Sequence, residues 1–354
     1  MSLAVSAVPS EEKQLVVRGL DSSESARWDA FVESCPEATF FHRVGWKTVI
    51  ETAFGHETHY LLAESEGAIE GVLPLGHVRS RLFGNALIST PFAVYGGVAA
   101  TSEAARSALE QSAENLAVRL GVDYLEVRNR AARRTDWPAK QLYVTFRKEM
   151  APDPESNLRS IPRRQRAVVR KGIDGGLKGE LDVDVDRFFE VYAESVRNLG
   201  TPVFSRKYFR TLRDVFGKDC DILTVTKNGR AVASVLTFYF RDEVLPYYGG
   251  GTAEARDLKA NDFMYWDLMR RSVERGFRLF DYGRSKVGSG SYRFKTHWGF
   301  EPEPLAYQYR LVRANQMPDV SPVNPRYRMM IRIWKRLPLS VTKALGPLIS
   351  NSLA

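Results

Sequence analysis

The polar residues with the clearest chemical potential lie between residues 279 and 297. Asp281 and Arg284 stand at the end of the apolar run Leu279-Phe280, and Lys295 follows a short way on. A cation here can hold a donor phosphate or stabilise the oxyanion that develops in acyl transfer. Asp281 alternates with Phe280, so its side chain is expected to point to a cleft, where it would act as a general base. A structural ion pair with Arg284 is an equally good explanation for this residue.

Tyrosine hydroxyls in the second half of the chain are candidates for moving a proton, because an amine acceptor must lose one. Core packing is the alternative explanation for each of them. The predicted catalytic set is Lys295, Arg284, Asp281 and Tyr248. Two histidines, His42 and His297, are further candidate bases, because an imidazole ordinarily suits proton transfer at neutral pH. Both neighbour aromatic residues, so a packed or surface histidine is the better interpretation.

A basic segment precedes this region. Its cations are Arg159, Arg163, Arg164, Arg166, Arg170 and Lys171, with Asp174 the one nearby acid. Such a cluster favours a phosphate-rich partner, either tRNA or a lipid pyrophosphate. A solvated helix face is the alternative. The predicted substrate-binding residues are Arg163, Arg164, Tyr292, Tyr95 and Asn261.

Composition limits the other classes of function. The chain of 354 residues carries a net charge of +9, which favours anionic partners. Its two cysteines, Cys35 and Cys220, lie far apart without a neighbouring CxxC or histidine pair, which argues against a disulfide framework or a cysteine-bound zinc. No HExxH pattern or Ser-His-Asp order supports hydrolase chemistry. We therefore predict no metal site.

The elements that position these residues follow one plan twice. Residues 58–75 read as a strand, a turn and a strand, and residues 220–240 repeat this pattern around Asn228-Gly229. Amphipathic helices are predicted at 102–120 and 260–275, each followed by a glycine and another strand. This order predicts an α+β fold made by internal duplication.

Several short motifs are arranged along this plan. In the first half they are Ala38–Trp46, Gly71–Leu75, Ser89–Phe92 and Tyr95–Gly97, and in the second half Phe280–Ser285 and Tyr292–Phe300. Together they resemble the Fem-like family of tandem acetyltransferase-fold (GNAT) proteins, over roughly residues 15–312. They look closest to the branch associated with exosortase (PEP-CTERM) and exopolysaccharide loci.

The resemblance implies two acetyltransferase-like domains, each with a mixed, mostly antiparallel sheet flanked by helices. The expected division is a flexible N-terminus at 1–14, a first domain at 15–155, a second domain with the active site at 156–314, and a basic amphipathic tail at 315–354. The implied activity is N-acyl or aminoacyl transfer to an amine of a cell-envelope or exopolysaccharide precursor. A non-catalytic scaffold protein of an envelope system is the alternative, because fold does not fix function.

The donor stays open between acyl-CoA and aminoacyl-tRNA, and no tightly bound cofactor is expected. Gly249-Gly250-Gly251 precedes helix 260–275, where acetyltransferases cradle the coenzyme A pyrophosphate, but the usual Q/R-x-x-G-x-G/A pattern is missing. A plain glycine-rich strand end is the alternative.

Location is predicted from the two ends of the chain. No signal peptide and no spanning segment are evident, so the cytoplasm is expected. Residues 320–354 contain no acidic residue and carry basic and apolar residues at helical spacing. This tail is expected either to touch the inner face of the membrane or to dock on the second domain.

Overall fold

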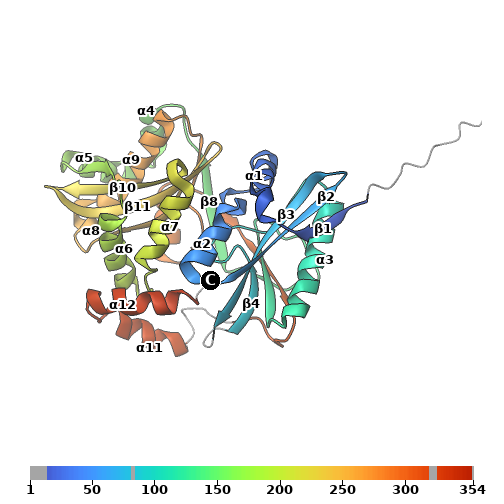
Figure 1. Cartoon of the computed structure of the whole chain (residues 1–354). Helices are drawn as coiled ribbons and strands as arrows, with labels where there is room; N and C mark the ends of the chain where they lie inside the picture. The colour runs from blue at the N-terminus through green and yellow to red at the C-terminus, as the bar shows by residue number, and fades with distance from the viewer. Residues whose placement is uncertain (1–13, 81–83, 319–324, 353–354) are drawn as a thin grey trace, which may run out of the picture.

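The computed structural model consists of two mixed sheets flanked by helices, one in each half of the molecule (Figure 1). It describes residues 14–80, 84–318 and 325–352. The predicted α+β class and the duplicated plan are confirmed. The flexible segment expected at 1–14 lies almost wholly outside the described residues.

The first sheet is antiparallel except for the parallel pair β4–β6. Its order is β1 (Val16–Gly19), β2 (Glu57–Ser65), β3 (Ala68–Ser80), β4 (Gly84–Ser89), β6 (Tyr124–Asn129), β16 (Ala306–Leu311) and β7 (Ala139–Lys140), with β5 (Ala99–Ala100) on β3. The predicted hairpin at 58–75 is the β2–β3 pair.

The second sheet repeats this arrangement, with one parallel pair, β12–β13. Its order is β14 (Ser285–Lys286), β8 (Tyr143–Glu149), β13 (Leu279–Asp281), β12 (Glu243–Gly251), β11 (Arg230–Phe240), β10 (Cys220–Lys227) and β9 (Lys178–Leu181), with β15 (Pro302–Pro304) on β8. Asn228 and Gly229 both have positive φ in the β10–β11 turn, as the Asn-Gly signal predicted.

Two strands cross the division predicted at residue 155. Strand β8 precedes it in sequence but pairs with β13 in the second sheet, whereas β16 follows it and pairs with β6 in the first. The halves therefore exchange one strand each. Element order alone could not reveal this, because an alternating apolar strand fits either sheet.

The helices cover the two sheets. They are α1 (Ser25–Ser34), α2 (Gly45–Phe54), α3 (Glu103–Leu120), α4 (Pro154–Ser160), α5 (Arg163–Asp174), α6 (Asp186–Leu199), α7 (Arg206–Phe216), α8 (Ala255–Leu258), α9 (Ala260–Glu274), α10 (Gly290–His297), α11 (Pro325–Trp334) and α12 (Leu339–Ser350). Short 3-10 turns span Ser22–Glu24, Phe40–His42 and Gly217–Asp219. The helix predicted at 260–275 is α9.

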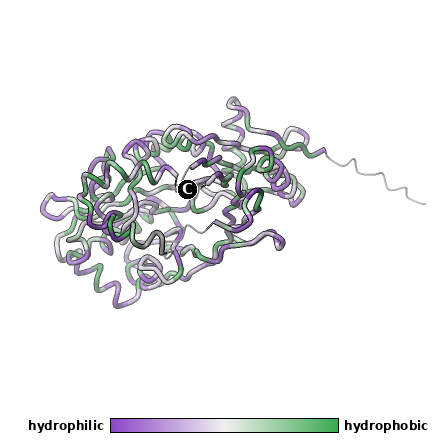
Figure 2. The backbone as a smooth tube through the Cα atoms, turned by 90° about the horizontal axis from the view of Figure 1, so that it is seen from below, coloured by the Kyte–Doolittle hydropathy of each residue, from purple (hydrophilic) through white to green (hydrophobic). Residues whose placement is uncertain are grey.

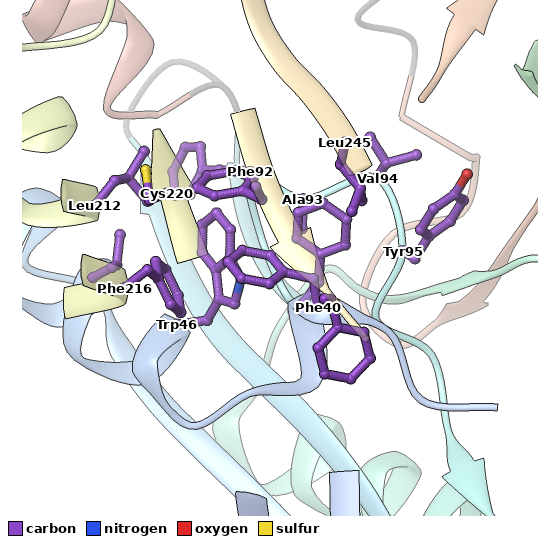
Figure 3. Close-up of a cluster of buried hydrophobic side chains, with 14 of the residues drawn as sticks. Phe40, Trp46, Phe92, Ala93, Val94, Tyr95, Leu212, Phe216, Cys220 and Leu245 are labelled. Carbon is purple, nitrogen blue, oxygen red and sulfur yellow. The ribbon is translucent and has the colours of Figure 1, made fainter. Parts of the chain in front are cut away.

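An aromatic core joins the two halves (Figure 3). The ring of Phe40 stacks on Phe238 of β11 at 4.5 Å between centroids and contacts Phe216 of α7 at 4.6 Å. Trp46 of α2 packs against Phe216 at 5.6 Å. Burial of several large rings at one junction stabilises the pair of domains as one body.

No helix in the described ranges is long and apolar enough to cross a membrane. Hydrophobic and hydrophilic stretches alternate along the backbone in both halves (Figure 2). Both cysteines are free, buried thiols.

Candidate functional site

A cleft opens between the halves where β12 and β13 separate. The two strands pair only at Glu243–Leu279 and Val244–Phe280, so beyond Asp281 the sheet splits and leaves the side of β12 uncovered. The cavity there has a volume of about 270 Å³. Its lining residues are Phe92, Val94, Tyr192, Phe204, Pro246, Tyr247, Tyr248, Tyr282, Gly283 and Arg284. Aromatic rings form most of the wall.

Arg284 is the cation of this cleft. Its guanidinium lies 4.6 Å from the ring centroid of Tyr143 and 5.7 Å from that of Tyr307. Its Nη1 donates to the Tyr307 hydroxyl at 3.3 Å, and that hydroxyl donates to the carbonyl of Val94. The side chain is exposed and makes no ion pair with an acid among the described residues. An unneutralised guanidinium held between two rings is suited to an anionic group or a developing oxyanion.

Asp281 does not pair with Arg284 and does not face the cleft. It is buried, and its carboxylate accepts from the Gly283 N–H at 2.7 Å and from the Tyr95 hydroxyl at 3.1 Å. Arg147 Nε lies 3.3 Å from Asp281 Oδ2. The carboxylate is thus the centre of a polar junction between the halves, and its predicted position as a cleft-facing base does not fit this geometry.

Tyr95 belongs to the same junction and does not line the cleft of Arg284. Its ring is buried, and its hydroxyl contacts Thr145 Oγ1 as well as Asp281. Burial raises the pKa of Tyr95 well above its ordinary value, so this hydroxyl stays protonated and can donate to the carboxylate.

Lys295 holds the loop at the wall of the cleft through its buried ammonium. It lies in α10, a helix capped by Ser289. Its Nζ donates to the carbonyls of Tyr282, Gly283 and Arg284 at 2.7, 2.9 and 3.2 Å. An ammonium has three donors, so none remains for a donor phosphate. Burial lowers the pKa of Lys295 to about 7. Lys295 is therefore a positioning residue for the loop that carries Arg284.

Tyr248 forms part of the cleft wall, as predicted for a catalytic hydroxyl. The Tyr248 and Tyr208 hydroxyls lie 2.8 Å apart. Burial raises the pKa of Tyr248 well above its ordinary value, so it can pass on a proton only as a neutral hydroxyl. Its neighbour Tyr247 donates to the carbonyl of Phe92 at 3.0 Å, which ties the wall to the first half.

The remaining predicted substrate contacts do not line this cavity. Tyr292 is half-buried and packs edge-on against Phe146 at 5.5 Å. Asn261 lies in the first turn of α9 beside Gly251, and Arg163 and Arg164 are exposed on α5.

Arg163 and Arg164 belong to a second, basic region. Arg163, Arg166, Arg170 and Lys171 line a shallow hollow of about 440 Å³ together with Asp174.

The glycine run before α9 is explained by packing. A Cβ on Gly250 would lie 2.5 Å from Ser195 of α6, and one on Gly251 would lie 2.5 Å from the Cβ of Ala255. The first turn of α9 also carries Asp262, which accepts from Trp298 Nε1 at 3.0 Å. An acid here opposes a pyrophosphate at the helix N-terminus. The structure therefore gives coenzyme A no pre-formed glycine cradle.

The two candidate histidines differ in their surroundings. His42 is buried, its Nδ1 lies 3.0 Å from the Thr39 N–H and its Nε2 2.8 Å from the Gly97 carbonyl. Burial lowers the pKa of His42 to about 4, which makes it a neutral structural residue at neutral pH. His297 is exposed on α10.

Sequence reasoning missed Tyr143 and Tyr307, which flank Arg284. They come from β8 and β16, the two exchanged strands. No local pattern distinguishes them from other strand tyrosines, because only the long-range pairing brings them to the cleft.

Comparison with known proteins identifies the domain type. Residues 156–296 match a family described as the acetyltransferase (GNAT) domain. No curated protein matches the chain in sequence. These residues are similar in sequence to an acetyltransferase domain, and the prediction of an acyltransferase is confirmed at this level.

Solved structures share the fold over most of the chain. FemX matches with a TM-score of 0.67 at 14% identity, over 89% of this chain and 100% of its own. L-PGS from Bacillus licheniformis matches with a TM-score of 0.54 at 13% identity, over 93% of this chain and 100% of its own. The tandem GNAT protein from the clavulanic acid biosynthesis pathway gives 0.52 at 12% identity, over 84% and 99%. The tandem GNAT fold expected from the Fem-like resemblance is thereby confirmed.

Proposed function

We propose that this chain transfers an acyl or aminoacyl group to an amine of a cell-envelope or exopolysaccharide precursor, and that it belongs to the exosortase-associated branch. The observation that carries the proposal is Arg284, an unpaired cation in an aromatic cleft at the point where the acetyltransferase sheet splits. Similarity in fold to FemX and to L-PGS supports the aminoacyl form of the reaction.

The reaction follows from the residues at the cleft. The amine nitrogen attacks the acyl carbonyl, a C–N bond forms, and the C–O bond of an ester or the C–S bond of a thioester breaks. Arg284 stabilises the oxyanion or holds an anionic group of a substrate. The Tyr248 hydroxyl, paired with Tyr208, passes the proton of the amine towards the leaving group. The aromatic walls exclude water and so limit hydrolysis of the donor.

Donor binding tests this proposal. The purified chain is titrated with acetyl-coenzyme A and, separately, with aminoacyl-tRNA and uncharged tRNA. Saturable binding of aminoacyl-tRNA in preference to uncharged tRNA supports the aminoacyl reaction, and saturable coenzyme A binding supports an acyl-CoA reaction. If neither donor binds, the scaffold alternative is favoured. The buried, structural positions of Asp281 and Lys295 would be consistent with that alternative.

The basic face of α5 is the proposed contact for tRNA. Arg163, Arg166, Arg170 and Lys171 lie on one face and make no ion pair with an acid among the described residues. The double variant Arg166→Glu/Arg170→Glu is expected to weaken tRNA binding about tenfold or more and to flatten its salt dependence, because fewer phosphates are neutralised. Filter binding at several salt concentrations measures both effects.

A matched control is available for this experiment. Arg119 of α3 is exposed on the other half, and Arg119→Glu changes charge without touching α5. An equal loss in the control and in the single variant Arg166→Glu would show general electrostatic attraction and contradict a dedicated tRNA face.

The C-terminal helices form the proposed membrane surface. Lys343 of α12 pairs with Glu190 at 2.8 Å, and Ser350 Oγ donates to the Val203 carbonyl, so α12 docks on the second half. The two C-terminal helices also carry large exposed apolar residues: Met329, Met330, Ile333, Leu345 and Leu348. Exposed Arg332, Lys335 and Arg336 accompany them. Apolar residues next to unopposed cations are typical of contact with an anionic lipid surface.

Ile333→Asp/Leu348→Asp is expected to lower binding to anionic vesicles about tenfold, because two apolar side chains no longer enter the interface and two negative charges are added. Co-sedimentation with vesicles of anionic and of neutral lipid measures this. Val183 is 91% exposed elsewhere, so Val183→Asp is the matched control. Unchanged sedimentation of the double variant would refute the surface.

A further inference from the structure

One face of the β2–β3 hairpin gathers three groups that bind metals. Glu57 and His59 are two residues apart on β2 and so point to the same face. His77 of β3 lies directly opposite Glu57 in the antiparallel register. The three side chains are therefore neighbours through strand pairing, and they belong to the first sheet, whereas Arg284 follows β13 of the second.

The spacing of the ligand atoms suits a small divalent ion. One ligand atom of each residue lies within 4.8 Å of the others. The distance from Glu57 Oε1 to His59 Nε2 is 3.5 Å. A tetrahedral zinc with bonds of about 2.1 Å requires about 3.4 Å between ligand atoms. Only small side-chain rotations separate the three groups from coordination.

The imidazole of His59 supplies an independent observation. Its Nε2 is buried and has no hydrogen-bond partner, which is rare for a buried polar atom. An ion beside Nε2 would satisfy this atom.

His77 is oriented in the way that metal-binding histidines usually are. Its Nε2 lies 2.6 Å from Asn85 Oδ1 of β4, an acceptor, and 3.4 Å from Arg79 Nε, a donor. The shorter contact with Asn85 favours Nε2 as the donor and leaves Nδ1 to coordinate. Arg79 Nη2 now lies 3.2 Å from Nδ1. The Arg79 side chain is 65% exposed, so it can swing into solvent without a change in the core.

We propose that Glu57, His59 and His77 bind one divalent transition-metal ion, with zinc as the best match to two imidazoles and a carboxylate and with water as the fourth ligand. The bound ion joins β2 to β3 beside His56, whose Nε2 contacts the carbonyl of Asn351 at the end of α12 at 2.8 Å. The site thus lies at the end of the strand pair that contacts the C-terminal end of α12. It is independent of the proposed acyl transfer.

The test is a zinc titration of the full chain, prepared without a histidine tag and stripped with a chelator. We expect one equivalent of zinc to bind, and both His59→Ala and His77→Ala to lower the affinity about tenfold or more. Zinc should also raise the melting temperature of the wild type but not of these variants. The metal-free melting temperature of His59→Ala should stay close to the wild type, since Nε2 makes no hydrogen bond.

The matched control is His297→Ala, which removes an exposed histidine on α10 and should bind zinc like the wild type. Magnesium is the control ion and should not compete. Binding that is not stoichiometric, or that is as strong in His59→Ala and His77→Ala as in the wild type, would overturn the proposal.

Discussion

Replacing Arg284 with methionine is expected to lower the rate of acyl transfer about 100-fold or more, because a cation that stabilises developing charge contributes most in the transition state. Methionine keeps an unbranched side chain but removes the charge that lies over the rings of Tyr143 and Tyr307. The measurement is single-turnover transfer of a labelled acyl group from the donor that the binding experiment selects.

The fold should survive this change. Arg284 donates one long hydrogen bond, at 3.3 Å to Tyr307, and makes no ion pair with an acid among the described residues. The melting temperature of Arg284→Met should therefore stay close to that of the wild type. Arg293 of α10 is exposed and donates to the Gly288 carbonyl, and Arg293→Met is the matched control. Wild-type rates for Arg284→Met would remove Arg284 from the mechanism.

Lys295→Met is expected to destabilise the protein by about 3 kcal/mol, because the carbonyls of Tyr282, Gly283 and Arg284 lose their shared buried donor. Activity should fall as well, since the loop that holds Arg284 is released. Denaturant unfolding of the wild type and the variant measures the first effect, and the transfer assay measures the second.

The pH dependence of folding stability distinguishes the positioning role of Lys295 from a direct contact with substrate. Burial lowers the pKa of Lys295 to about 7 from an ordinary value of 10.5. Between these two values the unfolded chain holds the proton and the folded chain does not, so folding stability rises with pH in this window. The wild type should therefore gain stability relative to Lys295→Met from pH 7 upwards. Lys218→Met, an exposed control, should follow the wild type.

A purely catalytic lysine would give a different pattern. Lys295→Met would then unfold at the same denaturant concentration as the wild type at every pH, with only the transfer rate reduced. That outcome would contradict the positioning role that the three carbonyl contacts indicate.

The sequence predicts the parts of the site that depend on local signals. The strand that ends at Asp281 and the helix α9 follow from apolar periodicity, so Arg284 could be placed at a strand end near a ligand. The turn at Asn228-Gly229 and the repeated plan are equally local. These signals were sufficient for the class of fold.

The roles of Asp281 and Lys295 could not be predicted, because their partners are distant in sequence. Arg147 and Tyr95 reach Asp281 across 134 and 186 residues of chain, and the carbonyls that Lys295 binds depend on how α10 packs. Ser289 was a readable helix-capping signal that we missed. The Glu57, His59 and His77 cluster was missed because histidine spacing on different strands becomes visible only once the register is known.

The most direct test of the central claim is detection of the transfer product. The wild type and Arg284→Met are incubated with aminoacyl-tRNA or acyl-coenzyme A and with amine-bearing envelope precursors, and N-acylated products are sought by mass spectrometry. The account predicts an amide product with the wild type that is almost absent with Arg284→Met and unchanged with Arg293→Met. No product with either donor, or equal product from all three proteins, would contradict it.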